Sequence, residues 1–124
     1  MKKEIKNTIL IVDDEVIVKK SLEKVLKDEY SILQAENGEV ALNMLAIHAE
    51  KIVAIVLDMV MPVMDGLTFL EHFRNYQEYN NIPVIVATSN DDEGVEQKCL
   101  EYGVWDFVMK PYNPFLLQFR IKNV

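Results

Sequence analysis

The chain is poor in cysteine and glycine, and each shortage excludes a class of protein. Its 124 residues include one cysteine, Cys99, which excludes an internal disulfide framework and a cysteine-based zinc site. Its four glycines, at positions 38, 66, 94 and 103, fit neither GxxxxGK[ST] nor GxGxxG. Nucleotide binding by a glycine-rich loop is therefore excluded.

Basic residues and long apolar runs are also scarce. The chain has 13 Lys and Arg residues and 20 Asp and Glu residues. Its net charge of -7 repels phosphate backbones and anionic membranes. Near the amino terminus only Ile9–Val12 are continuously apolar before Asp13, which is too short for a signal peptide or a membrane span. We expect one cytoplasmic domain, with no direct nucleic-acid or membrane partner.

Short apolar runs alternate with segments of helical periodicity along the whole chain. Three runs are nearly continuous, as in strands buried on both faces of a parallel sheet: Thr8–Val12, Ile52–Leu57 and Pro83–Ala87. Two more mixed runs, Tyr30–Ala35 and Trp105–Met109, are expected to flank them. Five strand–helix pairs predict an α/β fold, with a parallel sheet between two layers of helices.

Polar residues end four of these runs, at the edge where such sheets bind ligands. They are Asp13, Asp14 and Glu15 after the first run, Asp58 after the third, Thr88 and Ser89 after the fourth, and Lys110 and Pro111 after the fifth. Each alone is better explained by a strand end or a helix cap. Together, clustered carboxylates indicate a hard cation such as Mg2+, and a carboxylate can attack phosphorus if the phosphoryl charge is neutralised.

Five segments carry a family resemblance that covers essentially all 124 residues. They are ILIVDDE at 9–15, AENGEVAL at 35–42, VLDMVMPVMDGL at 56–67, PVIVATS at 83–89 and YGVWDFVMKPYNP at 102–114. On these residues the chain resembles the receiver domain of two-component response regulators. The resemblance implies a flavodoxin-like (βα)5 fold, a doubly wound sheet with strand order 2-1-3-4-5.

The resemblance also implies a function, a phosphoacceptor and a metal site. Asp58 would accept a phosphoryl group from a phosphohistidine of a sensor histidine kinase or a phosphotransfer protein. The protein would then be a switch for an output domain or a protein partner, promoting only its own phosphorylation and dephosphorylation rather than acting as an enzyme. Mg2+, or Mn2+ as an alternative, would be held by Asp14 directly, Asp13 partly through water, Asp58 and the Val60 backbone carbonyl.

Further roles follow from the same resemblance. Lys110 and Thr88 would contact the phosphoryl oxygens, and Thr88 together with Phe107 would form the switch. The Lys110–Pro111 peptide bond would be cis, a geometry that proline makes accessible. Phe107 lacks a hydroxyl, so an output signal that needs a tyrosine hydrogen bond is not expected.

The carboxyl-terminal segment 113–124 has two apolar stripes. One, formed by Leu117, Ile121 and Val124, can cover the sheet. The other is either covered by neighbouring helices or exposed for a partner, and it contains Phe115, Leu116 and Phe119. With Trp105, this stripe belongs to the expected output surface of the fourth helix, fifth strand and fifth helix. The resemblance implies that a homodimer can form through this surface, as in many receivers. Because the pattern stops at Val124 without a cap, we expect residues 1–124 to be a receiver domain excised from a longer response regulator.

A second class of function shares part of this chemistry. Aspartate-nucleophile phosphatases of the haloacid dehalogenase type also use an aspartate, a lysine and Mg2+. They carry Asp-x-Asp after the first strand, whereas Asp13 and Asp14 are adjacent here. The signalling switch is therefore favoured over the phosphatase.

Overall fold

The five predicted strands form a single parallel sheet. The computed structural model describes residues 7–88, 93–110 and 113–124. Its strands are β1 (Thr8–Val12), β2 (Ser31–Ala35), β3 (Ile52–Asp58), β4 (Val84–Thr88) and β5 (Asp106–Met109). The sheet order is β2-β1-β3-β4-β5, which confirms both the doubly wound fold and the strand order that the resemblance implied.

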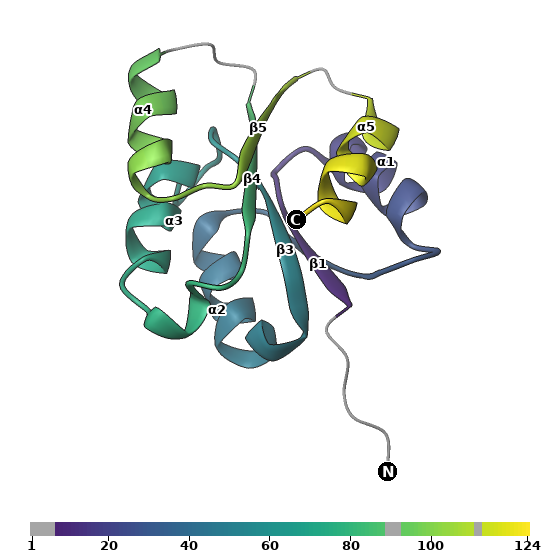
Figure 1. Cartoon of the computed structure of the whole chain (residues 1–124), viewed down its shortest axis with the longest axis horizontal. Coiled ribbons are helices and arrows are strands. Elements are labelled where there is room, and N and C mark those ends of the chain that lie inside the picture. Colours follow the sequence, from purple (N-terminus) through teal and green to yellow (C-terminus); the bar gives the residue numbers. More distant parts are fainter. Residues whose placement is uncertain (1–6, 89–92, 111–112) are drawn as a thin grey trace.

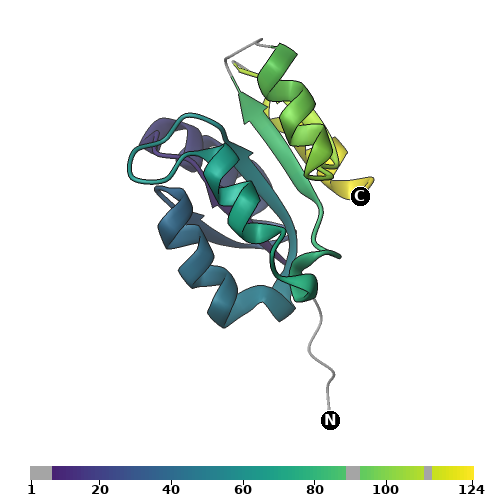
Figure 2. The same cartoon turned by 90° about the vertical axis from the view of Figure 1, so that its left-hand side faces the viewer.

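Helices cover both faces of the sheet. Helices α1 (Val16–Leu26) and α5 (Pro114–Lys122) lie on one side, and α2 (Gly38–His48), α3 (Gly66–Phe73) and α4 (Glu93–Glu101) lie on the other (Figures 1 and 2). Two short 3-10 turns, Ala49–Lys51 and Gln77–Tyr79, precede β3 and β4. In the part of the chain that the structure describes, no helix combines the length and apolar character needed to cross a bilayer.

Two hydrophobic clusters form the core, one on each face of the sheet. Side chains alternate between the faces along a strand, so Leu10 and Val12 join one cluster while Ile9 and Ile11 join the other. All four are fully buried, as expected for a central strand of a parallel sheet. The flanking strand β2 is more exposed, which agrees with its mixed sequence.

The strand ends differ slightly from the sequence prediction. Asp58 and Thr88 were expected to follow their strands, but each is the last residue of its strand. Asp58 is in register with Ala87, and Thr88 is in register with Met109. The sheet therefore fixes the backbone of both residues directly.

Polar caps and one glycine set the helix boundaries. Asn37, Asp65 and Asn113 each accept a hydrogen bond from a backbone N–H in the first turn of α2, α3 and α5. Gly103, with φ +72°, lies just after α4 and ends it.

The loop between β3 and α3 closes tightly on the strand end. A Cβ atom at Gly66 would lie 2.5 Å from the carbonyl oxygen of Asp58 and 2.5 Å from Cε of Met59. The Gly66 N–H donates to the Met59 carbonyl at 3.0 Å. In the same loop Val63 has φ 67°, a left-handed conformation that is rare for a β-branched residue. This loop thus combines a close backbone approach with local strain.

Gly66→Ala is expected to lower the free energy of unfolding by about 1–3 kcal/mol, because the new methyl group would overlap backbone atoms. Urea unfolding measures the change. Gly94→Ala is the control: Gly94 is exposed within α4, where alanine favours the helix by up to about 1 kcal/mol. Equal effects of the two substitutions would contradict the close-packing explanation.

Candidate functional site

The carboxyl ends of the parallel strands bring the predicted polar residues to one edge of the sheet. Asp13 directly follows β1, Asp58 ends β3 and Thr88 ends β4, and all three are buried. Lys110 directly follows β5, and its backbone N–H donates to the Thr88 carbonyl at 2.8 Å. Residues from four strands thus converge at this edge.

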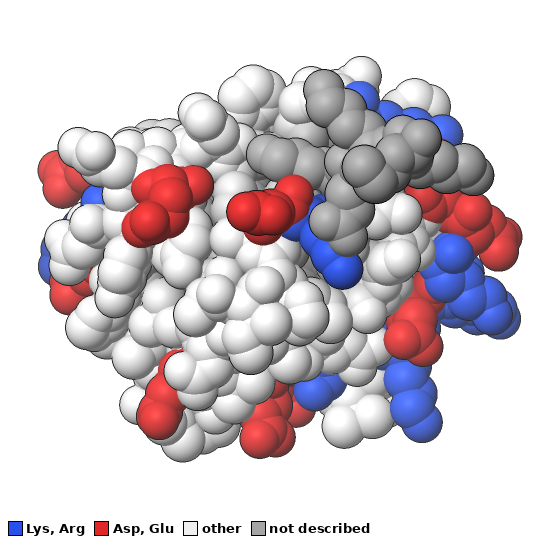
Figure 3. Space-filling model, turned by 90° about the horizontal axis from the view of Figure 1, so that it is seen from below, with Lys and Arg blue, Asp and Glu red and all other residues white. Residues whose placement is uncertain are grey.

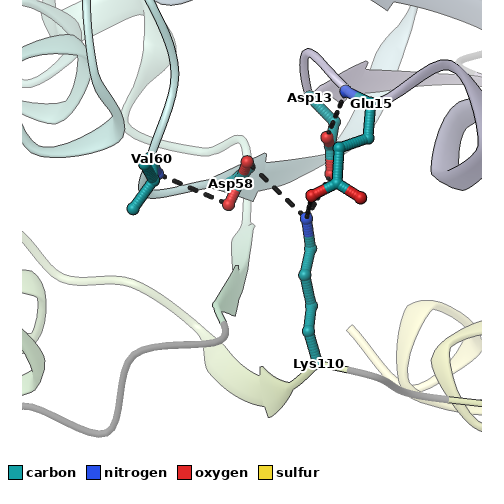
Figure 4. A network of polar contacts seen from close by, with 5 residues as sticks. All are labelled: Asp13, Glu15, Asp58, Val60 and Lys110. Carbon is teal, nitrogen blue, oxygen red and sulfur yellow. Dashed lines mark hydrogen bonds and ion pairs between the residues drawn. The ribbon is translucent and has the colours of Figure 1, made fainter.

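The Lys110 ammonium group is the centre of this arrangement. Its Nζ lies 2.8 Å from Oδ2 of Asp13, 3.6 Å from Oδ2 of Asp58 and 3.6 Å from Oε1 of Glu15 (Figure 4). Asp13 also accepts the Glu15 backbone N–H at 2.8 Å through Oδ1, which holds its carboxylate in place. One cation therefore compensates several carboxylates in a nearly buried position.

The acidic residues have the donor set and the spacing that a hard divalent cation needs. Asp13, Asp14 and Asp58 each offer a carboxylate oxygen, and these oxygens lie within 4.8 Å of one another. Opposite ligands of octahedral Mg2+ are separated by about 4.2 Å, so small side-chain rotations would suffice. Asp14 is exposed and Asp13 and Asp58 are buried, which leaves one side of the cluster open.

The environment of Asp58 disfavours its charge. Burial raises the pKa of the Asp58 carboxyl most, and the negative charge of Asp13 raises it further. The Lys110 charge and the Val60 N–H, which donates to Oδ1 of Asp58 at 3.4 Å, oppose this. The resulting pKa is about 6, against an ordinary value of 3.8. Asp58 is therefore ionised at neutral pH but carries an unfavourable charge.

The opposite holds for Lys110. Burial alone would lower the pKa of its ammonium group, but the hydrogen bond to Asp13 and the charges of Asp13, Asp58 and Glu15 outweigh burial. The pKa of Lys110 therefore lies above its ordinary value. Lys110 remains a cation across the physiological range of pH.

Three further predicted residues have mixed outcomes. The Val60 side chain is exposed, and the contact that the structure shows is made by its N–H to Asp58, so a metal bond from its carbonyl stays a prediction. Phe107 is half-buried on β5 and packs against the core cluster that contains Phe69 and Phe73. Pro111 lies outside the described residues, so the cis peptide bond after Lys110 also stays a prediction.

The predicted output surface is exposed and apolar. Leu117 and Ile121 are buried beneath α5, whereas Phe115 is 63% exposed and Phe119 is 69% exposed. Of the two alternatives for the second stripe, the exposed one therefore holds. The exposed large apolar side chains on this surface are Leu100, Trp105, Met109, Phe115, Leu116 and Phe119. Leu100 and Met109 were not singled out from the sequence.

The pairing of Glu15 with Lys110 was not predicted from the sequence. The position of Glu15 in the run Asp13-Asp14-Glu15 was the available signal, but the run does not show which carboxylates turn inward. Figure 3 shows the molecule from below, where a broad uncharged area lies beside an acidic and a basic side chain, and most other charged side chains lie toward the edges of the view. Among the described residues, no second group of three metal-ligating side chains is as close as Asp13, Asp14 and Asp58.

Comparisons with known proteins agree with this geometry. The family model for the response regulator receiver domain matches residues 9–122. A probable transcriptional regulator, ycf27 of Guillardia theta, is 36% identical over 122 residues, which is 98% of this chain and 46% of ycf27. Histidine kinase P4 of Formosa agariphila is 33% identical over 119 residues, 96% of this chain and 8% of that protein. The chain thus spans less than half the length of these curated relatives.

A solved structure provides the same comparison in three dimensions. The structure of the CheX–CheY complex with BeF3 and Mg2+ from Borrelia burgdorferi has a TM-score of 0.86 and 29% sequence identity. The similarity covers 94% of this chain and 87% of that chain. The similarity therefore extends over nearly all of the fold.

The raised pKa of Asp58 predicts a pH-dependent loss of stability. Because the folded-state pKa of about 6 exceeds 3.8, the folded protein binds this proton more tightly than the unfolded chain does. The stabilisation is full below about pH 4 and is lost as the pH rises through 6. Between pH 4 and 7 the unfolding free energy should fall by up to about 3 kcal/mol relative to Asp58→Asn. Urea unfolding in chelator-containing buffers measures this, and parallel pH curves would contradict it.

Proposed function

The chain belongs to the response regulator receiver family, and from that membership we propose that Asp58 is its phosphoacceptor. Receiver domains are phosphorylation-dependent signalling switches that interact with histidine kinases and output domains. The observation that carries the assignment is the position of Asp58: it is buried at the end of β3, with Oδ2 3.6 Å from the Lys110 ammonium group. Asp13 is also buried beside Lys110, but it lies just beyond β1 and accepts the Glu15 backbone N–H, whereas Asp58 is part of its strand.

The chemistry follows from the ionisation state of Asp58. With a pKa of about 6, its carboxylate is available as a nucleophile at neutral pH. An oxygen of Asp58 forms a bond to phosphorus while the phosphorus–nitrogen bond of the donor phosphohistidine breaks, and the released imidazole nitrogen keeps the electron pair and binds a proton. Lys110 and Thr88 lie at the same edge, which supports the proposal that the ammonium group and the hydroxyl contact the phosphoryl oxygens.

Receiver domains bind Mg2+ at an acidic pocket, and the cluster of Asp13, Asp14 and Asp58 fits such an ion. We assign these three carboxylates, with the Val60 carbonyl, as its ligands, and Mn2+ as an alternative ion. The bound cation would neutralise phosphoryl charge during transfer. The Glu15 backbone N–H holds the Asp13 carboxylate in its orientation without a bound ion, so one of the proposed ligands is already in place.

Thr88 and Phe107 are the residues proposed to pass the signal onward. Thr88 ends β4 at the phosphorylation edge, the edge of the sheet where Asp58 lies. Phe107 lies on the adjacent strand β5, in register with Val86. Phosphorylation biases the position of Thr88, and Phe107 can respond because it is half-buried rather than fixed in the core.

The exposed apolar surface of α4, β5 and α5 is the proposed output surface. Six large apolar side chains of α4, β5, α5 and the turn before β5 are about half exposed or more. The longer relatives support a role in which this surface controls an output domain, a protein partner or a second copy of the chain. The phosphatase alternative is less supported, because the buried Asp58 ends the third strand, whereas those enzymes carry Asp-x-Asp after the first.

Asp58→Asn should abolish labelling by acetyl phosphate, because the amide cannot form the acyl phosphate. Mass spectrometry of the protein treated with and without Mg2+ measures the label, and a chelator should also remove it from the unsubstituted protein. Glu50→Gln is a control that removes a carboxylate far from this edge and should keep full labelling. Stoichiometric labelling of Asp58→Asn would place the phosphoacceptor elsewhere.

Phe119→Glu should weaken self-association or partner binding of the beryllofluoride-treated protein while Asp58 labelling stays intact. The reason is the loss of apolar area that an interface would bury, worth roughly 25 cal/mol per Å2 before association costs. Sedimentation with beryllofluoride and Mg2+ measures the oligomeric state, and urea unfolding measures stability. An unchanged state together with lower stability would instead identify Phe119 as a structural residue.

A further inference from the structure

Helix α4 has fewer buried side chains than the other helices. Among its described side chains only Cys99 is buried, whereas α3 buries Gly66, Phe69, Leu70 and Phe73. A helix with so little buried area opens more readily than its neighbours. Its position therefore depends on a small number of specific contacts.

Near the N-terminal end of α4 the half-buried Val95 packs against the core, and the sulfur and hydrogen-bond contacts lie in the C-terminal half of α4 and in the turn that follows. Sγ of Cys99 lies 3.5 Å from Sδ of Met59, the residue after Asp58. The Arg74 guanidinium group, at the C-terminal cap of α3, donates from Nε to the Tyr102 carbonyl and from Nη2 to the Gly103 carbonyl at 3.1 Å. The last carbonyls of a helix lack intrahelical donors, and Arg74 provides donors just beyond the end of α4.

Arg74 is itself held against the core. Its guanidinium carbon lies 4.9 Å from the centre of the Phe73 ring, and Phe73 is fully buried. Burial lowers the pKa of the Arg74 guanidinium group below its ordinary value, and a guanidinium group stays charged at neutral pH. The two carbonyls beyond α4 are therefore bonded to a cation that packs on α3.

We propose that Arg74 is a positioning residue that fixes the C-terminal end of α4, so that phosphorylation moves the N-terminal end about it. The inference rests on the proposed function, since it takes Asp58 as the origin of the signal. Strand β4 ends at Thr88 and α4 begins at Glu93, so its N-terminal end is the one joined to the phosphorylation edge. Signalling would then reorient α4 rather than displace it as a whole.

The first experiment needs no phosphodonor. Because Cys99 is the single cysteine and is fully buried, its rate of reaction with a thiol reagent reports opening of α4. Arg74→Met should raise this rate by about tenfold, because the helix opens more often when the hydrogen bonds from a charged group are lost. It should also speed deuterium exchange at 102–104 without changing exchange in α1. Arg120→Met is the matched control, because Arg120 pairs with Asp106 instead, and it should leave the Cys99 rate within about twofold of the unsubstituted protein.

Arg74→Lys provides a second variant that keeps the charge and one donor, and it should give an intermediate Cys99 rate. Equal acceleration of Cys99 reaction and of exchange in α1 would mean that Arg74 stabilises the whole fold, which would overturn the proposal. An unchanged Cys99 rate in both Arg74 variants would overturn it as well.

The second experiment compares deuterium exchange with and without beryllofluoride and Mg2+. In the unsubstituted protein the change should fall on residues 94–97 and be absent from 99–104, and in Arg74→Met it should extend to 99–104. If deuterium exchange changed equally at both ends of α4 in the unsubstituted protein, the proposal that its C-terminal end is fixed would be overturned, but the phosphorylation site would not. No change anywhere would instead overturn the phosphorylation site, and the role of Arg74 in signalling with it.

Discussion

The ion pairing of one nearly buried ammonium group with several carboxylates is the interaction on which the rest of the structure depends. Lys110 contacts Asp13, Glu15 and Asp58 although 97 residues separate Lys110 from Asp13. Like charges at one sheet edge are costly without a compensating cation. The order in which β5 pairs with β4, and β3 with β1, is what brings this cation to the carboxylates.

The same arrangement compensates the negative charge of Asp58 only in part. Lys110 is fully charged, but it lies closer to Asp13 than to Asp58, and the pKa of Asp58 stays raised. A carboxylate whose charge is only partly compensated gains from a bound cation. The fold imposes this incomplete neutralisation through the positions of the strand ends.

The sequence predicts the strands well because the central ones are buried on both faces. Thr8–Val12 is found with its predicted boundaries, and the apolar run starting at Ile52 becomes β3 with one extra residue. The shifts at Asp58 and Thr88 arise because backbone pairing continues past the last apolar side chain, which composition does not show. The strand order came from the family resemblance, since periodicity alone gives no order.

For the site, residue types and strand ends were enough to predict that Asp13, Asp58, Thr88 and Lys110 meet. The contacts of Glu15 and Arg74 could not be predicted from the sequence, because they depend on the directions of long side chains on elements far apart in the chain.

The left-handed conformation of Val63 has a consequence for protein engineering. This conformation costs a β-branched residue roughly 1–2 kcal/mol, and the side chain is 78% exposed, so little packing offsets the cost. The loop cannot relax easily, because hydrogen bonds hold Met64 to Gly38 and Gly66 to Met59. Replacing Val63 with glycine or asparagine would therefore raise the thermostability of the chain without altering its core or its acidic cluster.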